Sequence, residues 1–290
     1  MRLDGRRESN NVEDRRGMGG GKKAGIGGIG GIILVAVIAY FTGQNPLEAV
    51  LHQVGNQYAM QDPATEQVQQ QFSPEEEELA KFSRQVLAGT EDVWTELFQE
   101  MGRTYTPPKL VLFTNSVNSA CGSASSAVGP FYCSADQKLY IDLSFFLQMK
   151  RNLGADGDFA YAYVIAHEVG HHVENLLGIL GEAHSQMNGM SKTEANKVSV
   201  RLELLADYYA GVWAHHDQAR YGSLEEGDFE EAIDCAEKIG DNYLQEKAHG
   251  HSQPDSFTHG TSEQRMRWFK LGFDRGDMSI STFNQLESEL

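Results

Sequence analysis

The segment His167-Glu168-Val169-Gly170-His171 constrains the fold of this 290-residue chain more than any other part of its sequence. It has the spacing H-E-x-x-H, and in an α-helix residues four apart lie on the same face. Two imidazoles at these positions can bind one metal ion, and the glutamate between them can act as a base beside it. The motif therefore predicts a helix that carries two ligands of a zinc site.

The residues around the motif have the pattern of a helix with one buried face. Asp158 follows Gly157 and is suited to an N-cap, and Gly178 is suited to end the helix. Apolar side chains recur between these residues with a helical period, at Phe159, Tyr163, Ile165, Ala166, Val169, Val173 and Leu176. We therefore expect a helix that is capped by Asp158 and ended by Gly178.

A catalytic zinc ion usually has three protein ligands and one open position for water. The predicted third ligand is Glu203, in a helix that begins with a capping box at Ser191 and runs to about His215. Asp207 lies one turn later on the same face, where it can accept a hydrogen bond from the spare ring N–H of His167. The alternative is an exposed acidic edge of the helix, but the neighbours of both acids are mainly apolar residues rather than lysines.

A third segment supplies candidates for stabilising a transition state. His259 precedes a predicted amphipathic helix that contains Arg265. An imidazole beside the zinc ion could donate a hydrogen bond to the oxyanion that forms when an amide is hydrolysed. The alternative for His259 is a solvated loop histidine, and Arg265 is the weaker candidate of the two.

The order of the predicted elements indicates an α+β domain. Helices are expected at 74–88 and 91–101, short strands at 109–114, 128–132 and 138–143, and the helices of the motif after them. A mixed order of this kind favours a small sheet packed on helices, and about two hundred residues suffice for one core. We expect this domain to span residues 73–290, with a strand edge beside the zinc site that could pair with an extended substrate.

The chain resembles a known family in these motifs. His167, Glu168, His171, Glu203 with Asp207, and the segment from His259 to Arg265 are similar to the gluzincin arrangement of zinc peptidases. More closely, the chain resembles the bacterial family described as putative neutral zinc metallopeptidases, through residues 5–9, 11–16, 129–133, 141–145 and 255–261. The resemblance implies a single-pass membrane protein with a zincin-like metallopeptidase domain. The chain departs from the family at Tyr208 and at 279–281, where relatives often carry cysteines.

The N-terminal part of the chain has a different composition from the rest. Residues 24–41 are uncharged, mostly apolar and about long enough to span a bilayer, and basic residues precede them. No Lys or Arg follows until Lys81, so the positive-inside rule predicts a cytoplasmic N-terminus and an extracytoplasmic domain at the bacterial inner membrane. The predicted parts are a basic cytoplasmic tail at 1–23, a transmembrane helix at 24–41 and a Gln-rich tether at 42–72.

Two further features of this part of the chain bear on its partners. A cleaved signal peptide is the alternative to an anchor, but residues 39–42 lack small residues in the required register. Gly27 and Gly31 could let two such helices pack closely, which makes a homo-oligomer an open prediction.

The charge and cysteine content narrow the function classes. The chain has 24 basic and 41 acidic residues and a formal net charge of −17, which argues against a nucleic-acid partner. Three cysteines in an extracytoplasmic domain suggest one disulfide, for which Cys121 and Cys133 are the candidates. We expect Cys235, which lies in an apolar helical pattern, to be a free buried thiol.

These observations together predict a zinc-dependent endopeptidase that acts on a protein or peptide substrate. Zn²⁺ would be bound by His167, His171 and Glu203, Glu168 would serve as base and then acid, and His259 would stabilise the oxyanion. One alternative is a membrane-tethered adaptor that binds zinc without turnover, although such a site has no use for a general base. The other is a zinc amidase that acts on a nonpeptide amide.

Overall fold

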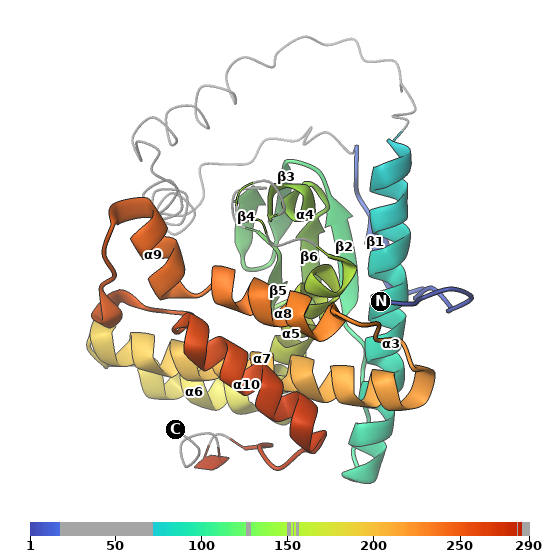
Figure 1. The fold of residues 1–290 in the computed structure, drawn as a ribbon. Coiled ribbons are helices and arrows are strands. Elements are labelled where there is room, and N and C mark those ends of the chain that lie inside the picture. The colour runs from blue at the N-terminus through green and yellow to red at the C-terminus, as the bar shows by residue number, and fades with distance from the viewer. Residues whose placement is uncertain are drawn as a thin grey trace.

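The computed structural model of this chain describes residues 1–17, 72–125, 129–149, 152, 154, 157–282 and 284–285. Within these residues a small sheet lies against a set of helices (Figure 1). The sheet has the strand order β1-β2-β6-β5, with β5 antiparallel to β6 and the other pairs parallel. Its strands are β1 (Val12–Asp14), β2 (Lys109–Phe113), β5 (Phe131–Cys133) and β6 (Lys138–Asp142), and a separate hairpin is formed by β3 (Ser116–Ser119) and β4 (Gly122–Ser125).

Most helices follow the sheet in the sequence. The helices are α3 (Pro74–Glu100), α4 (Ser144–Gln148), α5 (Asp158–Leu177), α6 (Ile179–Met187), α7 (Lys192–Tyr221), α8 (Asp228–Lys238), α9 (Asp241–His249), the 3₁₀ turn η3 (Pro254–Ser256) and α10 (Ser262–Arg275). The predicted α+β class is confirmed by this mixture of sheet and helices.

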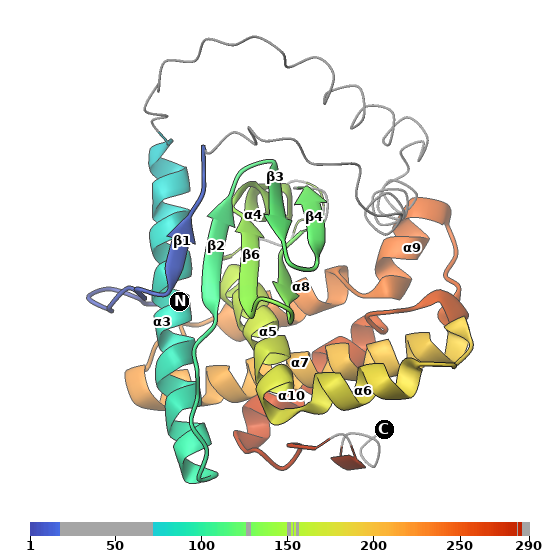
Figure 2. The same ribbon diagram turned by 180° about the vertical axis from the view of Figure 1, so that it is seen from behind.

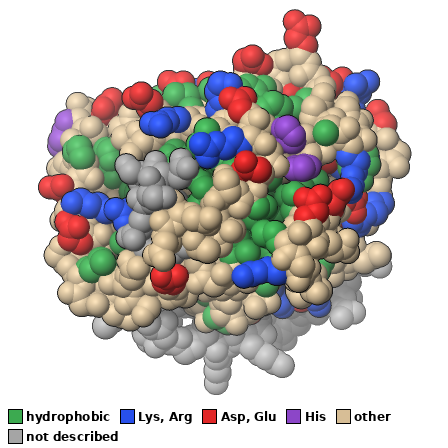
Figure 3. Space-filling view, turned by 90° about the horizontal axis from the view of Figure 1, so that it is seen from below, with side chains coloured by type: hydrophobic (Ala, Val, Ile, Leu, Met, Phe, Trp, Pro, Cys, Tyr) green, Lys and Arg blue, Asp and Glu red, His purple; other side chains and the backbone are tan. Residues whose placement is uncertain are grey.

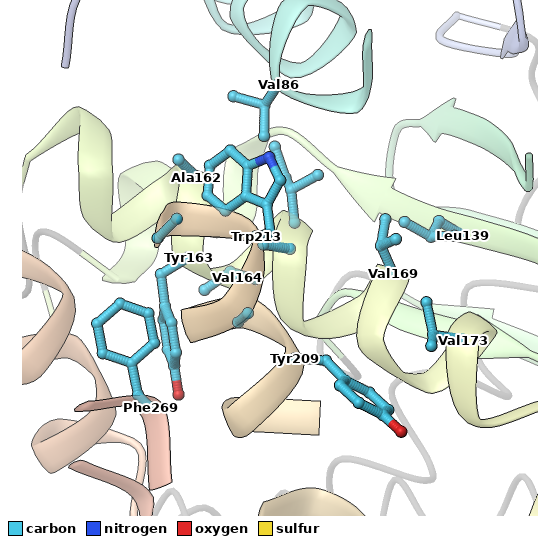
Figure 4. Close-up of a cluster of buried hydrophobic side chains, with 14 of the residues drawn as sticks. Val86, Leu139, Ala162, Tyr163, Val164, Val169, Val173, Tyr209, Trp213 and Phe269 are labelled. Carbon is cyan, nitrogen blue, oxygen red and sulfur yellow. The ribbon is translucent and has the colours of Figure 1, made fainter. Parts of the chain in front are cut away.

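The core lies between the sheet and helices α3, α5, α7 and α10 (Figure 4). Helix α5 contacts strand β5, α3 and α7, and α10 packs on α7. Val86 of α3, Leu139 of β6 and Trp213 of α7 are each no more than 1% exposed. Trp94 of α3 packs edge-to-face on Tyr209 of α7, with ring centroids 5.5 Å apart. Burial of aromatic and aliphatic side chains on this scale fixes α5 between the sheet and α7.

One predicted break in a helix is absent. Residues 74–88 and 91–101 were predicted as two helices, but α3 runs through both ranges to Glu100. Gly89 lies at the predicted break, and a Cβ there would come within 2.6 Å of Arg6 Nη2 and 2.9 Å of Asp217 Oδ1. The glycine therefore makes room for an ion pair against the helix and does not end it.

Residues 1–17 belong to the folded domain, and the prediction of a separate tail at 1–23 is wrong for them. Strand β1 pairs with β2 in the register Val12↔Leu110, and it lies beside α3 at one side of the sheet (Figure 2). Met1 and Leu3 are buried in the core. The strand has only three residues, two of them charged, so its sequence carries no alternation that could have revealed it.

Buried ion pairs hold this N-terminal segment, residues 1–17, on the domain. The α-amino group of Met1 lies 2.6 Å from Asp158 Oδ1 and 3.0 Å from Asp228 Oδ2. The guanidinium of Arg6 donates two hydrogen bonds to Asp217, of 3.0 and 2.6 Å. The predicted placement of the N-terminus and the domain on opposite sides of a membrane conflicts with these contacts, because a bilayer cannot separate paired groups.

The remaining N-terminal predictions fall on other residues. The predicted transmembrane helix at 24–41 and all but the last residue of the predicted tether at 42–72 lie outside the described residues. In the part of the chain that the structure describes, no helix combines the length and the apolarity needed to cross a bilayer.

Tyr208, where the resemblance implied a cysteine, connects α7 to the C-terminal residues. Its hydroxyl donates to Asp277 Oδ1 over 2.7 Å and lies 3.2 Å from Ser279 Oγ. Hydrogen bonds of this buried tyrosine therefore link α7 to the segment that contains Asp277 and Ser279.

Acidic and basic side chains are mixed over the surface shown in Figure 3, with hydrophobic and histidine side chains between them. On this face neighbouring charges of opposite sign partly offset each other. The overall charge of −17 therefore does not gather there into one acidic field.

Candidate metal centre

Helices α5 and α7 bring the three predicted ligands together. His167 and His171 lie one turn apart on α5, with ring centroids separated by 4.8 Å. On α7, Glu203 places Oε2 at 3.2 Å from Nε2 of His167 and Oε1 at 3.6 Å from Nε2 of His171. The three residues offer ligand atoms that all lie within 4.8 Å of one another.

The spacing of these atoms fits a zinc ion. Bonds of about 2.0–2.2 Å in a tetrahedron put two ligand atoms roughly 3.3–3.6 Å apart. The contacts of 3.2 and 3.6 Å between the imidazoles and Glu203 agree with that span. Two imidazole nitrogens and one carboxylate oxygen are also a donor set that zinc accepts while keeping a fourth position for water.

Gly170 lets the two helices come this close. A Cβ at Gly170 would lie 2.8 Å from the carbonyl oxygen and 2.9 Å from the Cα of Ala206. Any side chain would push α7 away from α5 next to His171 and Glu203. The sequence analysis assigned Gly170 no role, although a glycine inside a buried helix costs helix stability and so signals close packing.

A buried network holds His167 from the side opposite to Glu203. Its Nδ1 lies 2.8 Å from Asp207 Oδ1, the contact that was predicted from sequence. Arg265 of α10 donates to both oxygens of Asp207, over 2.8 and 2.9 Å, and the hydroxyl of Tyr163 donates to Oδ1 over 2.5 Å. Asp207 thus accepts the Nδ1–H of His167 and leaves Nε2 free to bind a metal.

Arg265 also compensates the charge of Asp207. Burial raises the pKa of Asp207, but Arg265 and His167 outweigh it and hold this pKa below its usual value. Asp207 is fully buried and Arg265 is 3% exposed. Asp207 is therefore an ionised hydrogen-bond acceptor, and Arg265, rather than solvent, compensates its charge.

His171 has a corresponding partner that the sequence analysis missed. Its Nδ1 lies 3.0 Å from Oε2 of Glu174, three residues later on α5. Burial raises the pKa of Glu174 to about 7, although His171 opposes the shift. The i,i+3 spacing was visible in the sequence, but it passed unnoticed beside the stronger H-E-x-x-H pattern.

Glu168 lies beside the ligands in a buried position suited to proton transfer. It follows His167 on α5 and is 8% exposed. Burial raises its pKa, while the two ligand histidines lower it by a smaller amount. A carboxylate with a raised pKa can take a proton from water and return it within one cycle.

His259 is held near the centre by a residue that the sequence did not reveal. Oδ2 of Asp241, the first residue of α9, accepts the backbone N–H groups of Thr258 and His259 over 2.6 and 2.7 Å. Oδ1 of the same carboxylate lies 3.1 Å from Nδ1 of His259. The His259 side chain is 51% exposed. Partial desolvation lowers its pKa, but Glu203 and Asp241 raise this pKa above its usual value. Seventeen residues separate Asp241 from Thr258, so no local pattern connects them.

The remaining candidates are placed as follows. Cys121 and Cys133 form a disulfide that joins the β3–β4 turn to β5, and Cys235 is a free buried thiol. His172 faces away from the ligands, with Nδ1 3.0 Å from the Tyr132 hydroxyl and Nε2 donating to the carbonyl oxygen of Thr106. Burial lowers the pKa of His172 to about 4, so it is neutral near pH 7.

Comparisons with known proteins give the following matches. A model of the family described as "Putative neutral zinc metallopeptidase" matches residues 1–283. "Uncharacterized protein YpfJ" from Escherichia coli strain K12 is 49% identical over 283 residues, which cover 96% of each chain. "Uncharacterized protein Rv2575" from Mycobacterium tuberculosis strain H37Rv is 41% identical over 186 residues, which cover 61% of this chain and 62% of the relative. No solved structure matches this chain.

Proposed function

The chain belongs to the family described as putative neutral zinc metallopeptidases, and from that premise we propose that it is a zinc-dependent endopeptidase. One observation carries the proposal. The Nε2 atoms of His167 and His171 lie 3.2 and 3.6 Å from the carboxylate oxygens of Glu203, which is the separation of two ligand atoms around one zinc ion. The buried carboxylate of Glu168 lies beside them. His167, His171 and Glu203 would hold the ion, which supplies Lewis acidity and lowers the pKa of a bound water.

The side chains of the centre have separate tasks in this reaction. Glu168 takes a proton from the attacking water and then passes it to the leaving amine. His259 donates a hydrogen bond to the oxyanion of the tetrahedral intermediate, and Asp241 keeps its ring in place. Asp207 holds the tautomer of His167 in which Nε2 carries the lone pair.

The sheet offers a place for an extended substrate. Strand β5 pairs with β6 on one side, and among the described residues no strand pairs with its other side. The strand contacts α5, and the hydroxyl of its Tyr132 contacts His172 and Asn175 on that helix. A peptide that adds to this edge by main-chain hydrogen bonds would lie alongside the motif helix, as in a zincin-like domain.

The test uses the full chain purified in detergent. Glu168→Gln should keep stoichiometric zinc while kcat on an unstructured protein falls about 10²- to 10⁴-fold. Glu203→Ala should lose both zinc and turnover, because one of three ligands is gone. Glu182→Gln, on the exposed surface of α6, is the matched control and should change neither.

The same experiment separates the alternatives. A parent protein that holds stoichiometric zinc and cleaves nothing in a broad peptide library would be the tethered adaptor. Cleavage of nonpeptide amides without cleavage of peptides would identify the amidase. Either result contradicts the endopeptidase.

For the location of the protein, we propose that the N-terminus and the catalytic domain lie together on the extracytoplasmic side of the inner membrane. The support is the Cys121–Cys133 disulfide, which is typical of oxidising compartments, and the packing of residues 1–17 on the domain. A single crossing by residues 24–41 would separate these two parts, so this topology does not include it. An association of residues 24–41 with the membrane surface, and an oligomer through Gly27 and Gly31, are proposals from composition alone.

Cysteine labelling in intact cells tests this topology. Asp4→Cys and Glu263→Cys introduce single thiols at exposed positions on the N-terminal segment and on α10. Both variants should react with a membrane-impermeant maleimide. Labelling of the Glu263→Cys variant alone would restore the predicted cytoplasmic N-terminus.

A further inference from the structure

The two ligand histidines are each held by a carboxylate, but the two carboxylates differ in charge compensation. Asp207 faces His167 and is neutralised by two hydrogen bonds from Arg265. Glu174 faces His171 through Oε2, and no Lys or Arg in the described part of the chain forms an ion pair with it. Its other oxygen, Oε1, is buried and has no hydrogen-bond partner among the described residues.

A purely structural role does not explain Glu174. The side chain is fully buried on α5, where an isolated carboxylate is costly. Among the described residues, Oε2 has one hydrogen-bond partner, the His171 ring, and Oε1 has none. Half of the carboxylate is therefore unsatisfied within the described part of the chain.

A cation bound at Nε2 of His171 would change this balance. The ring would then transmit the positive charge of the ion to Nδ1–H, and the hydrogen bond to Glu174 would become charge-assisted. Glu174 would also fix the ring orientation and the tautomer that presents Nε2 to the ion. Both effects favour the metal-bound state over the metal-free state.

We propose that Glu174 is a positioning residue of the metal centre, which holds His171 and contributes an uncompensated negative charge that raises the affinity for zinc. This inference rests on the proposed zinc site. Under this proposal, removing the charge of Asp207 and removing the charge of Glu174 have different effects on the metal-free fold. Loss of charge at Asp207 leaves Arg265 as a buried unpaired cation. Loss of charge at Glu174 strands no Lys or Arg of the described residues, and His171 keeps the carboxylate of Glu203 beside it. Neutralising Glu174 should therefore weaken zinc binding without weakening the metal-free fold.

The experiment measures the zinc dissociation constant of the full chain by competition with a chromophoric chelator, and the melting temperature after zinc removal. Glu174→Gln keeps an oxygen that can accept from Nδ1 and loses only the charge. Glu174→Leu loses the hydrogen bond as well. We expect zinc affinity to fall about 10- to 100-fold in the Gln variant and further in the Leu variant. The metal-free melting temperature of the Gln variant should equal or exceed that of the parent.

Two controls complete the design. Glu182→Gln, an exposed glutamate on α6, should leave both quantities unchanged. Asp207→Asn should lower the metal-free melting temperature, since it strands Arg265. Unchanged zinc affinity in Glu174→Gln, or a lower metal-free melting temperature in that variant, would overturn the positioning role. A parent protein that binds no zinc would instead overturn the proposed function itself.

Discussion

The metal centre and the N-terminal segment both use buried charges to join distant parts of the chain, yet they differ in how the sequence encodes those charges. At the centre, His167 and His171 stand four residues apart on one helix, and Glu203 and Asp207 stand four apart on another. In the segment, each charged group finds its partner far away, as Arg6 does at Asp217. Helical periodicity reveals pairs that lie four residues apart on one helix, but it does not reveal ion pairs between residues that are distant in the sequence.

The comparison also explains a misleading signal. The basic residues of the segment match the pattern of a cytoplasmic flank, and the positive-inside rule was applied to them. In the structure, Arg7 binds Glu91 over 2.9 Å and Arg16 binds Glu77 over 3.0 Å. These cations therefore compensate carboxylates of an acidic domain. Basic composition alone does not distinguish attraction to a membrane from attraction to the rest of the protein.

The largest effect is expected where the segment meets α7. Asp217 is 1% exposed and binds Arg6 through both oxygens. Asp217→Asn should leave the guanidinium buried without its counter-charge and lower the free energy of unfolding by about 3–5 kcal/mol. Urea denaturation of the full chain measures it.

The control is an exposed ion pair that joins α7 to α3. Arg220 binds Glu96, and both side chains are at least a third exposed. Glu96→Gln should cost at most about 1 kcal/mol. If Asp217→Asn and Glu96→Gln lowered the free energy of unfolding equally, the Arg6–Asp217 pair would not hold the N-terminal segment on the domain. The comparison of this segment with the metal centre would then fail.

A smaller effect is expected at the metal centre, from backbone spacing alone. Gly170→Ala places a methyl group against the backbone of Ala206 and should lower the free energy of unfolding by about 1–3 kcal/mol. The displaced α7 should also carry Glu203 away from the histidines, so zinc affinity should fall. Thermal unfolding and chelator competition report the two losses.

Gly181 on α6 provides the matching substitution, since a Cβ there meets nothing within 4 Å. Gly181→Ala should stabilise the helix by up to about 1 kcal/mol and leave zinc binding unchanged. Unaltered zinc affinity in Gly170→Ala would show that the close packing does not set the ligand distances.

The smallest effect concerns pH and strand β1. Hydrogen bonds from Lys138 and Arg15 lower the pKa of Glu13 to about 2 from a usual value of 4.5. A carboxylate whose pKa is lower in the folded state contributes stability above the unfolded value of about 4.5 and loses it as the pH falls toward 2. Glu13→Gln should remove this part of the acid dependence, by about 1 kcal/mol at most because the pair is partly exposed.

Unfolding measured between pH 7 and pH 2 provides the check. The curves of parent and variant should run parallel above about pH 5 and converge below pH 4. Curves that stay parallel down to pH 2 would show that Glu13 has no partner in solution, and that β1 is not docked as described.

Sequence patterns predicted the elements that carry their own periodicity. Helix α5 was expected between an N-cap at Asp158 and Gly178. It runs over Asp158–Leu177, with Gly157 as its N-cap, one residue earlier than predicted. Strands β2 and β6 differ from their predicted ranges by one residue at the end. Helix α7 extends to Tyr221, beyond the predicted end near His215. Its last turns have no apolar period, so the sequence pattern did not show that they are helical. The helix ends at Gly222, which has φ 58°. Local patterns therefore gave the position of most elements and left some ends open.

Contacts between distant residues could not be predicted in the same way. Asp207 was assigned to His167 because both belong to recognisable helical faces. Asp241 stands in the first turn of α9, whereas the histidine that it holds lies in the loop before α10. Strand β1 likewise depends on a partner strand that begins at Lys109. Such pairs arise from tertiary packing, which no short-range pattern records.

The docking of the N-terminal segment has a consequence for the order of assembly. Its residues leave the ribosome first, but the carboxylates that bind the amino group of Met1 follow 157 and 227 residues later. Closing loops of this length costs chain entropy before the contacts can offset it, and the contacts cannot form before α8 has been synthesised. This segment is therefore among the last parts of the domain to reach its native position, although it is synthesised before the rest of the domain.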